Sequence, residues 1–534
     1  MQEELSMKKH SIGCILLFLP FLLSATIGRI VEEYALPIDQ PYGLALDGNN
    51  LLISDRASGQ LFFFSLQEKK ITGSQPLPCE HPLGIVSDGK GLWVSDSQNQ
   101  RIFHFLPKEQ RVDLVLMDLE TNPTGLGWDG ANLWATSGKK FIKLDPSDGT
   151  EVQTFEGPGT DTTAVFCDGK YLWLTERIKD RLVCATKEGE IFAVLPSPGP
   201  YPTGICRQGD LLWVLDFEKR KLYALDIAFN TQPIYLGEAH RREVCFTHAL
   251  FNRGPSSDVQ GKLYFCVGED DIHQKIIKPL VFDRTDIVFE NDNWGQKFAV
   301  LEGNIPAQKS LVLGYTVQVE TRNSNYFIMP EWVQPLEKIP AEIRSKYLVD
   351  GHKLQIKDPY IRQLLKTIIG DEKSPFWIAY KIHRWLHLNI EYQRTGGWNA
   401  APTVLKRGTG SCSEFTFSFI ALARAAGIPA RYEAGLVVRG DEGSIDDVYH
   451  RWVQIYLPPF GWVAVDPSKG KPASAMDVAL SFGSLSERFF ITTHSGGDSP
   501  LLGWTYNSNA FYEFSGKAVI ENRTEAKWNP LPKQ

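Results

Sequence analysis

The sequence predicts a multidomain chain in which an all-β propeller is followed by a small β-domain and a mixed α+β domain. A block of two short strands recurs five times in the first half, whereas the second half has helical runs and separate motifs around a cysteine, a histidine and an aspartate. The chain has 534 residues, of which 43% are hydrophobic, so it can build three or four folded units at about 150 residues each. This composition excludes a mainly disordered protein.

The repeat in the first half has a period of about 40 residues. Its turn glycines are separated by 41, 41, 39 and 40 residues, at Gly48, Gly89, Gly130, Gly169 and Gly209. One apolar position in the second strand is Leu in the first block and Trp in the others, at Leu52, Trp93, Trp134, Trp173 and Trp213. Further strands such as KLYALD follow, and about four strands per repeat of this length are typical of a propeller blade. We expect the repeated Trp residues to pack between blades rather than to bind a ligand.

Six blades and a closing strand are predicted for this domain. The stretch VCFTHALFNRGPSSDVQGKLYFCVG repeats the pattern with a longer turn and is assigned as a sixth, irregular blade. The segment IVEEYALP at 30–37 is assigned as an outer strand that completes the last blade and removes an open sheet edge. The pattern resembles the six-bladed propellers built from NHL-like repeats, over residues 29–282. That resemblance implies a platform for a protein or glycan ligand.

Acidic residues follow the second strand in four of the blocks, at Asp55, Asp96, Glu176 and Asp216. They could line one face of the propeller, where propellers commonly bind ligands. Solvated loop carboxylates explain them equally well, so no ligand site is assigned to them.

Residues 1–28 have the features of a signal peptide. Lys8 and Lys9 supply a basic flank, and the uncharged apolar run 12–23 is followed by small residues suited to cleavage. This run is shorter than the roughly 20 residues that span a bilayer, although an uncleaved N-terminal anchor stays an alternative. We therefore expect an exported protein, periplasmic or extracellular. The net charge of −7 offers no basic surface for a nucleic acid.

The cysteines divide the chain into two parts. Six of the eight lie between Cys79 and Cys266, Cys14 lies in the signal segment, and the rest of the chain contains only Cys412. In an exported protein the six can form disulfides in any of fifteen pairings, or they can be small core residues. The sequence does not choose between these alternatives.

A β-sandwich-like domain is predicted at 283–344, since IVFEN, KFAVLEG and LVLGYTVQVET alternate apolar and polar residues. Two helices follow, one over 358–370 that begins at Asp358 and Pro359, and one over 374–392. These helices belong to a domain assigned to 345–500. The remaining residues, 501–534, are assigned as a C-terminal extension.

Three motifs in this domain point to nucleophilic catalysis by cysteine. Cys412 opens the run CSEFTFSFIALARAAG, so its thiol is expected in the first turn of a helix, where unpaired amides and the helix dipole stabilise a thiolate. The segments HRWVQIYL and GWVAVDP are predicted to form a hairpin that brings His450 and Asp466 together. The three residues form a possible Cys–His–Asp relay in that chain order.

These motifs resemble the three signature blocks of the transglutaminase-like superfamily, a papain-related fold. The blocks are GTGSCSEFTFSFIALARAAGIPAR around Cys412, HRWVQI at His450 and GWVAVDPS at Asp466, with Ser468 where Thr is more usual. The resemblance implies an amide hydrolase or transamidase that acts through a thioester on protein or peptide substrates. The competing interpretation is a non-catalytic exported binding protein that uses the propeller.

Neighbouring residues receive supporting roles. The backbone N–H of Cys412 is expected to help hold the oxyanion, with Trp398 or Asn399 as the second donor. Glu414 is interpreted as a carboxylate in the first turn of the helix, with Arg431 as its buried partner.

No metal or cofactor is predicted. His383 and His387 have the spacing of a zinc pair, but Arg384 stands where the metalloprotease motif needs Glu. The acidic loop DEGSIDD, from Asp441 to Asp447, matches no calcium-loop pattern and is interpreted as a solvated flap beside the active site.

Overall fold

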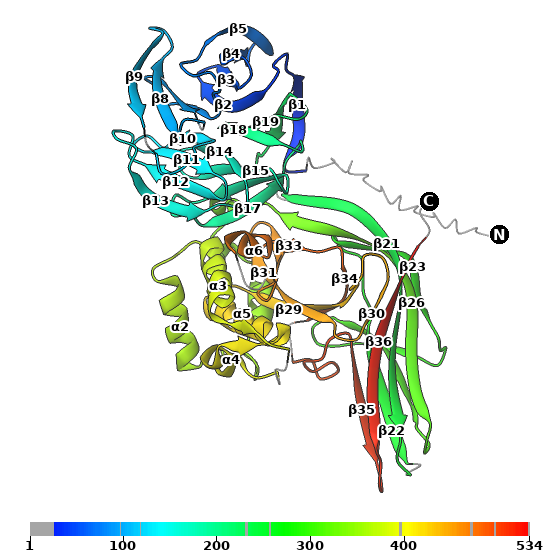
Figure 1. Ribbon diagram of the computed structural model, residues 1–534. Coiled ribbons are helices and arrows are strands. Elements are labelled where there is room, and N and C mark those ends of the chain that lie inside the picture. Colours follow the sequence, from blue (N-terminus) through cyan, green and yellow to red (C-terminus); the bar gives the residue numbers. More distant parts are fainter. Residues whose placement is uncertain are drawn as a thin grey trace, which may run out of the picture.

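The computed structural model describes residues 26–531 except 97, 118, 230–232, 256–257, 395–397, 470–473 and 496–497. Most of the predicted signal segment, with Cys14, lies outside the described residues. The chain forms a propeller, a two-sheet sandwich and a helical domain that lies beside both (Figure 1). Within the described part of the chain, no helix is both long and apolar enough to cross a membrane.

The propeller has five blades, each a four-stranded antiparallel sheet. The N-terminal strand β1 pairs with β20 and completes the last blade, as predicted, but that blade is the fifth and not the expected sixth. The ring closes because β18 of the fifth blade packs beside β2 of the first. In chain order the blades are β2 (Pro41–Asp47), β3 (Asn50–Asp55), β4 (Gln60–Ser65) and β5 (Lys70–Pro76); β6 (Ile85–Ser87), β7 (Leu92–Asp96), β8 (Arg101–Leu106) and β9 (Arg111–Leu116); β10 (Leu126–Trp128), β11 (Leu133–Ser137), β12 (Lys140–Leu144) and β13 (Glu151–Glu156); β14 (Thr162–Cys167), β15 (Leu172–Glu176), β16 (Arg181–Ala185) and β17 (Ile191–Pro196); and β18 (Pro202–Gln208), β19 (Leu211–Asp216), β20 (Lys221–Asp226) and β1 (Arg29–Ala35).

The prediction of a sixth blade is wrong. Its two strands, β21 (Ile234–Asn252) and β22 (Val259–Cys266), belong to the two sheets of the sandwich. Apolar and polar residues alternate in the same way in a blade and in a half-buried sandwich strand, so the local pattern does not separate the two. The propeller therefore ends near Asp226 and not at residue 282.

Repeated side chains stabilise the turn of each blade, and buried hydroxyls join neighbouring blades. The Asp of the Asp-Gly turn accepts a hydrogen bond from the indole Nε1 of the Trp five residues later, at 3.2, 3.0 and 2.9 Å in Asp88–Trp93, Asp129–Trp134 and Asp168–Trp173. A buried hydroxyl also links the first two blades, since Ser54 Oγ accepts from Gly43 N at 2.8 Å and donates to Leu83 O at 2.6 Å. The repeated Trp side chains are buried in the hydrophobic cores, as the packing interpretation predicted.

The four acidic residues after the second strands are buried rather than solvated, with exposed fractions of 3% or less at Asp55, Asp96, Glu176 and Asp216. Their carboxylates accept hydrogen bonds within their own blade. Asp216, for example, accepts from the backbone N–H groups of Tyr201 and Lys219, both at 2.7 Å. They stabilise the loops of the propeller, which the expectation of solvated carboxylates missed.

The sandwich is larger than the predicted 283–344 and is built from distant parts of the chain. Two sheets pack around one apolar core. Residues 508–530, assigned above to a C-terminal extension, supply one strand to each sheet. These strands pair with the edges of β21 and β22 that no other long strand covers. The sheets are β23 (Gln274–Phe282), β26 (Ser310–Tyr326), β21, β36 (Ile520–Pro530) and β30 (Ser444–Asp446), with β33 (Ser484–Leu485) beside β26; and β24 (Val288–Asn291), β25 (Lys297–Asn304), β22 and β35 (Ser508–Phe514).

The helical domain packs its helices against a four-stranded sheet. Both predicted helices are present as α2 and α3, and Asp358 caps α2 by accepting a hydrogen bond from Tyr360 N at 2.7 Å. The central helix α5 packs against β31 and β29. The elements are η1 (Pro330–Trp332), η2 (Leu336–Lys338), α1 (Ala341–Tyr347), α2 (Pro359–Ile369), α3 (Pro375–Asn389), α4 (Ala401–Arg407), α5 (Cys412–Ala425) and α6 (Ala475–Leu480), the sheet β32 (Gly461–Val465), β31 (His450–Leu457), β29 (Ala430–Val437) and β34 (Phe489–Ser495), and the pair β27 (Glu391–Tyr392) and β28 (Thr409–Gly410).

The propeller and the helical domain share a hydrophobic core. Helix α6 lies under strand β17 (Figure 1), and its Met476 and Ala479 belong to the same buried hydrophobic cluster as blade residues such as Trp134 and Val165. A shared apolar core of this kind restricts the relative motion of two domains. The propeller is therefore fixed relative to the helical domain.

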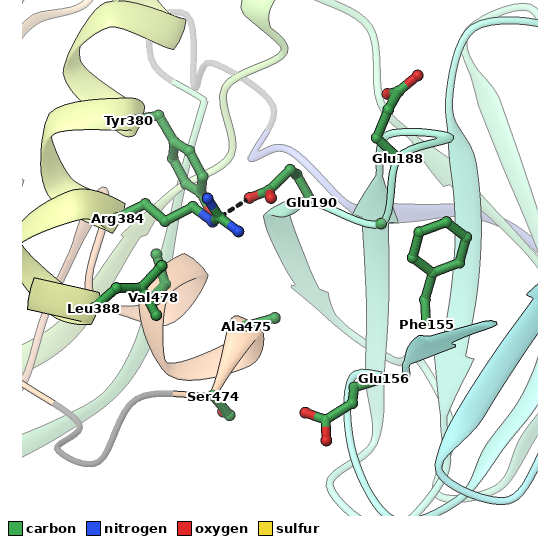
Figure 2. A pocket seen from close by; sticks show the side chains of 11 residues that line it. Phe155, Glu156, Glu188, Glu190, Tyr380, Arg384, Leu388, Ser474, Ala475 and Val478 are labelled. Atoms are coloured by element: carbon green, nitrogen blue, oxygen red, sulfur yellow. Dashed lines mark ion pairs between the residues drawn. The ribbon is translucent and has the colours of Figure 1, made fainter. Parts of the chain in front are cut away.

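A pocket of about 320 Å³ lies beside this contact, between the third and fourth blades and helix α3 (Figure 2). Arg384 of α3 forms an ion pair with Glu190 of the propeller at 2.9 Å, and the hydroxyl of Tyr380 donates to the carbonyl oxygen of Ile191. These polar contacts fix the orientation of the two domains, which the shared core holds together.

Candidate active site

Cys412 is the first residue of helix α5, as predicted. The chain reaches it from α4 through Gly408, whose left-handed backbone (φ 76°) ends that helix. Ser411 is the N-cap residue, and its backbone N–H donates to the Glu414 carboxylate at 3.1 Å. Because α5 packs on the sheet, Cys412 is only 6% exposed. Its thiol lies at the positive end of the helix dipole, which favours a thiolate.

His450 and Asp466 meet beside this thiol. His450 begins β31 and Asp466 follows β32, and the hairpin of these strands places His450 Nε2 at 2.7 Å from Asp466 Oδ2. The other ring nitrogen, Nδ1, is left for Cys412. Ser468 donates its backbone N–H and its hydroxyl to Asp466 Oδ1, at 3.1 and 2.9 Å. Ser468 thus supplies the hydroxyl that a Thr would supply, and its presence does not weaken the site.

The pKa values of these groups favour an imidazolium–thiolate pair. Burial by itself raises the pKa of the Cys412 thiol, but the hydrogen bond and positive charge of His450 lower that pKa to about 7. Burial lowers the pKa of His450, but the charge and hydrogen bond of Asp466 raise it to about 10. The pKa of the Asp466 carboxyl lies well below its usual range, because His450 outweighs the effect of burial. Near neutral pH, Asp466 and His450 are therefore charged.

The His450 ring is held in a stack of aromatic rings. Its centroid lies 5.9 Å from Trp452 and 5.4 Å from Phe489, with interplanar angles of 26° and 20°. The indole Nε1 of buried Trp452 donates to the buried carboxylate of Glu433 at 2.7 Å. This network fixes the plane of the imidazole.

Tyr506 is a residue of the site that the sequence analysis missed. Its hydroxyl lies 3.5 Å from Cys412 Sγ and also contacts the hydroxyl of Ser413. Tyr506 lies in the stretch assigned above to a C-terminal extension, 94 residues from Cys412 and without a recognisable motif. Only the tertiary fold brings it to the thiol.

The two candidates for a second oxyanion donor differ in the structure. Asn399 uses its backbone N–H and its side-chain amide to bind Glu414 Oε1, at 3.0 and 2.9 Å. Those groups are thus occupied. Trp398 packs its ring 5.9 Å from the ring of Tyr506, which lies beside Cys412, and Trp398 stays a predicted second donor.

Glu414 is buried in the first turn of α5, as predicted, but its partner is not Arg431. Its carboxylate pairs with Arg407 Nη2 at 3.0 Å, because α4 ends beside the start of α5. Arg431 instead donates to Gln454 Oε1 at 2.8 and 2.6 Å, across the neighbouring strands β29 and β31.

The two histidines with zinc-like spacing hold Ser481, which supports the Asp466 loop. The Ser481 hydroxyl lies 3.0 Å from His383 Nε2 and 3.2 Å from His387 Nε2, and its carbonyl accepts the backbone N–H of Asp466 at 2.9 Å. Across the described residues, no group of three or more His, Cys, Asp or Glu side chains is arranged to hold a metal.

The acidic loop is only partly the solvated flap that was predicted. Asp441 is solvated, with 98% of its side chain exposed. Asp446, in contrast, is buried, accepts from Val437 N at 2.7 Å, and belongs to β30, which pairs with β36 of the sandwich. Pairing with the sandwich holds this part of the loop in place.

The seven described cysteines are all free thiols, and five of them are buried. The burial of Cys184 and Cys206, both 0% exposed, fits the alternative of small core residues. Burial raises the pKa of Cys79 to about 12, whereas the pKa of Cys412 is lowered.

The geometry defines a domain of the cysteine–histidine–aspartate class, joined to a propeller and a sandwich. Residues 362–467, which contain all three of those residues, match the model of the transglutaminase-like superfamily. The chain therefore contains a transglutaminase-like domain.

Two curated relatives and one solved structure are similar to parts of the chain. An uncharacterized protein of Haemophilus influenzae is 29% identical over 208 residues, which are 34% of this chain and 55% of the relative. The uncharacterized protein YebA of Bacillus subtilis is 38% identical over 71 residues, which are 11% of this chain and 10% of YebA. The chain thus matches about half of the first relative's length and a tenth of the second's. A candidate cysteine protease of Cytophaga hutchinsonii is 16% identical with a TM-score of 0.42, over 56% of this chain and 94% of that one.

Proposed function

We propose that the protein is an exported, cysteine-dependent amide hydrolase or transamidase that acts through a thioester. The observation that carries this proposal is the imidazole of His450, held by Asp466 at 2.7 Å, beside a cysteine at the start of a helix. An imidazolium–thiolate pair at neutral pH is the form that attacks a carbonyl carbon.

The chain's own groups account for both halves of such a reaction. The Cys412 thiolate attacks the amide carbonyl carbon, and the backbone N–H of Cys412 binds the oxyanion that forms. His450 gives its proton to the leaving nitrogen, the C–N bond breaks, and a thioester and a free amine or ammonia result. Water or an amine then attacks the thioester while His450 takes its proton, the C–S bond breaks, and a carboxylic acid or a new amide leaves as the imidazolium–thiolate pair is restored.

Hydrolysis is the proposed main outcome, with a protein or peptide as the substrate. Water can reach any thioester that opens to solvent, whereas transamidation needs a second site that binds an amine. The proposal includes export, on the basis of residues 1–28, and recruitment of a protein or glycan ligand by the propeller. Its shared core with the helical domain supports this role, because a ligand on the propeller would lie at a fixed distance from Cys412.

Thiol labelling combined with product analysis tests this proposal. Wild-type protein, Cys412→Ala and the control Cys79→Ala are treated with iodoacetamide at neutral pH, and labelling is followed by peptide mass spectrometry. We expect fast labelling of wild type and Cys79→Ala at Cys412. Labelling of Cys412 no faster than that of an unactivated thiol would refute the proposed enzyme.

The second part of the experiment separates hydrolysis from transamidation. The same three proteins are incubated with a glutamine-rich protein and a fluorescent amine, and ammonia, peptide fragments and bound fluorescence are measured. Fragments or ammonia without bound amine, absent in Cys412→Ala, support hydrolysis. Bound amine without peptide fragments would show that transamidation, and not hydrolysis, is the main reaction.

A further inference from the structure

Arg451, the residue between His450 and Trp452, is buried in the helical domain. Its exposed fraction is 0%, and it points away from His450, into the space between β31 and α5. Four aromatic rings surround its guanidinium, with centroids at 5.5, 5.2, 4.7 and 4.3 Å from its carbon, in Trp398, Phe417, Tyr432 and Tyr506. Such rings attract a cation through their negative faces.

No carboxylate neutralises this cation among the residues that the structure describes. Its Nη2 donates to the carbonyl oxygens of Trp504 and of Thr505, the latter at 2.8 Å. Its Nε and Nη1 are buried without a hydrogen-bond partner in the same described set. Burying a charge in this way is costly unless something offsets it. The arrangement therefore needs an explanation beyond packing.

Tyr506 connects this buried cation to the thiol. The two carbonyls that Arg451 binds belong to the two residues directly before Tyr506, and the Tyr506 ring lies 4.3 Å from the guanidinium. The Tyr506 hydroxyl in turn lies 3.5 Å from Cys412 Sγ. Burial, and then the nearby Cys412, raise the pKa of Tyr506, so its hydroxyl keeps its proton and can donate a hydrogen bond.

We propose that Arg451 is a positioning residue of the cysteine site, whose guanidinium fixes the Tyr506 hydroxyl beside Cys412 and supplies the positive charge that balances the thiolate. This inference rests on the proposed function, because the anion that partners the buried guanidinium is the Cys412 thiolate, which the proposed reaction requires. The thiolate loses its own hydration on burial, and a fixed donor and a fixed charge replace it.

The charged and titratable groups around Cys412 agree with this role. After burial, which raises the pKa of the thiol, the groups that lower it are His450, Tyr506 and Arg451. Tyr392 also faces the site, and its pKa is raised by burial and by Cys412. Arg451 thus adds a second positive charge near the thiol, besides that of His450.

The test measures the rate of Cys412 alkylation by iodoacetamide from pH 5 to 10 in the full chain. The midpoint of this pH profile, at which half of Cys412 is thiolate, is the quantity compared. We expect Arg451→Met, which keeps a long apolar side chain without the charge, to raise this midpoint by about one pH unit and to lower the alkylation rate at pH 7 about fivefold. We expect Tyr506→Phe, which keeps the ring and loses the hydroxyl, to shift the midpoint in the same direction. Arg451→Lys keeps the charge and should shift it least.

Arg424→Met is the matched control for a purely structural arginine. Arg424 is also buried in α5, where it donates to Ala430 O at 2.9 and 2.6 Å and to Val349 O at 2.7 Å, at the end of the helix far from Cys412. We expect this control to lower the thermal midpoint without moving the alkylation midpoint. Circular dichroism identifies variants that fold.

Each outcome separates this inference from the proposed function. A wild-type midpoint like that of an ordinary thiol, near 9.0, would refute the proposed function itself. An activated wild-type thiol with an unchanged midpoint in folded Arg451→Met would overturn only the role of Arg451. If Arg451→Met does not fold, an unchanged midpoint in folded Tyr506→Phe would overturn it, because the Tyr506 hydroxyl is the group that Arg451 is proposed to position.

Discussion

Removing the charge of Asp466 is expected to inactivate the Cys412 thiol without removing it. Asp466→Asn keeps the size of the side chain and an oxygen that can accept from His450. It loses the negative charge that contributes most to raising the pKa of the buried imidazole from 6.5 to about 10. A buried imidazole without that charge is neutral near pH 7, because burial favours the neutral form. Cys412 then loses the cation that lowers its pKa most, while Arg451 stays in place.

The size of this effect follows from the pKa of the thiol. With a pKa of about 7, half of Cys412 is thiolate at pH 7, whereas the ordinary value of 9.0 leaves about 1%. The rate of alkylation at pH 7 should therefore fall about fiftyfold in Asp466→Asn. In wild type we expect the rate to rise through pH 7, and catalysis to fall again near pH 10 as His450 loses its proton.

The assay follows the Cys412 peptide by mass spectrometry after timed alkylation from pH 5 to 10. Ser468→Ala is the matched control, because it removes one hydrogen bond to Asp466 at 2.9 Å and leaves the charge in place. It should slow alkylation far less than Asp466→Asn does. A folded Asp466→Asn protein that is alkylated within about twofold of the wild-type rate at pH 7 would refute the electrostatic reasoning.

Three further predictions concern stability. The raised pKa of His450 stabilises the fold fully below pH 6.5 and less as pH rises towards 10, while the lowered pKa of Asp466 stabilises it above 3.8 and less as pH falls. The loss of unfolding free energy in Asp466→Asn should thus be largest between about pH 4 and 6.5 in urea titrations, and a loss that grows from pH 6.5 to 9 would contradict this. Met476→Ala should cost about 2–5 kcal/mol and lower a calorimetric transition shared by propeller and helical domain, whereas an unshifted propeller transition would argue against the shared core. Gly84→Ala should cost at least about 1–3 kcal/mol, since its Cβ would lie 2.4 Å from Thr124 O in the next blade, and an unchanged thermal midpoint would show that the blades can separate.

The positions of Cys412, His450 and Asp466 were predictable because each lies in a short motif with its own secondary structure. Cys412 sits between a glycine turn and a helical run, and His450 and Asp466 flank a short hairpin, so each motif carries its own secondary structure. Tyr506 and the pairing of Glu414 with Arg407 were not predictable in the same way. These contacts depend on how separate elements pack, and no pattern near Tyr506 marks it as part of a site.

The fold shows the same division between local and distant information. The period of the repeat located all five blades, because each turn and each Trp lies within a few residues of its partner. The sixth blade failed because β21 and β22 alternate like blade strands, and their partners β26, β36, β25 and β35 decide their sheet. Strand pairing over such separations leaves no trace in a single sequence. Arg451 was visible in the motif HRW, but its burial was not.

The order of strands in the sandwich sets the order in which the protein can mature. Strand β21 leaves the ribosome well before its neighbour β36, and β22 well before β35, with the whole helical domain synthesised between them (Figure 1). Until residues 506–530 emerge, both early strands present unpaired edges, which invite pairing with other chains, and Tyr506 is absent from Cys412. A nascent chain would therefore carry an incomplete cysteine site during synthesis. The same short segment, 506–530, supplies both missing strands of the sandwich and Tyr506, so the scaffold and the site depend on the same stretch of chain.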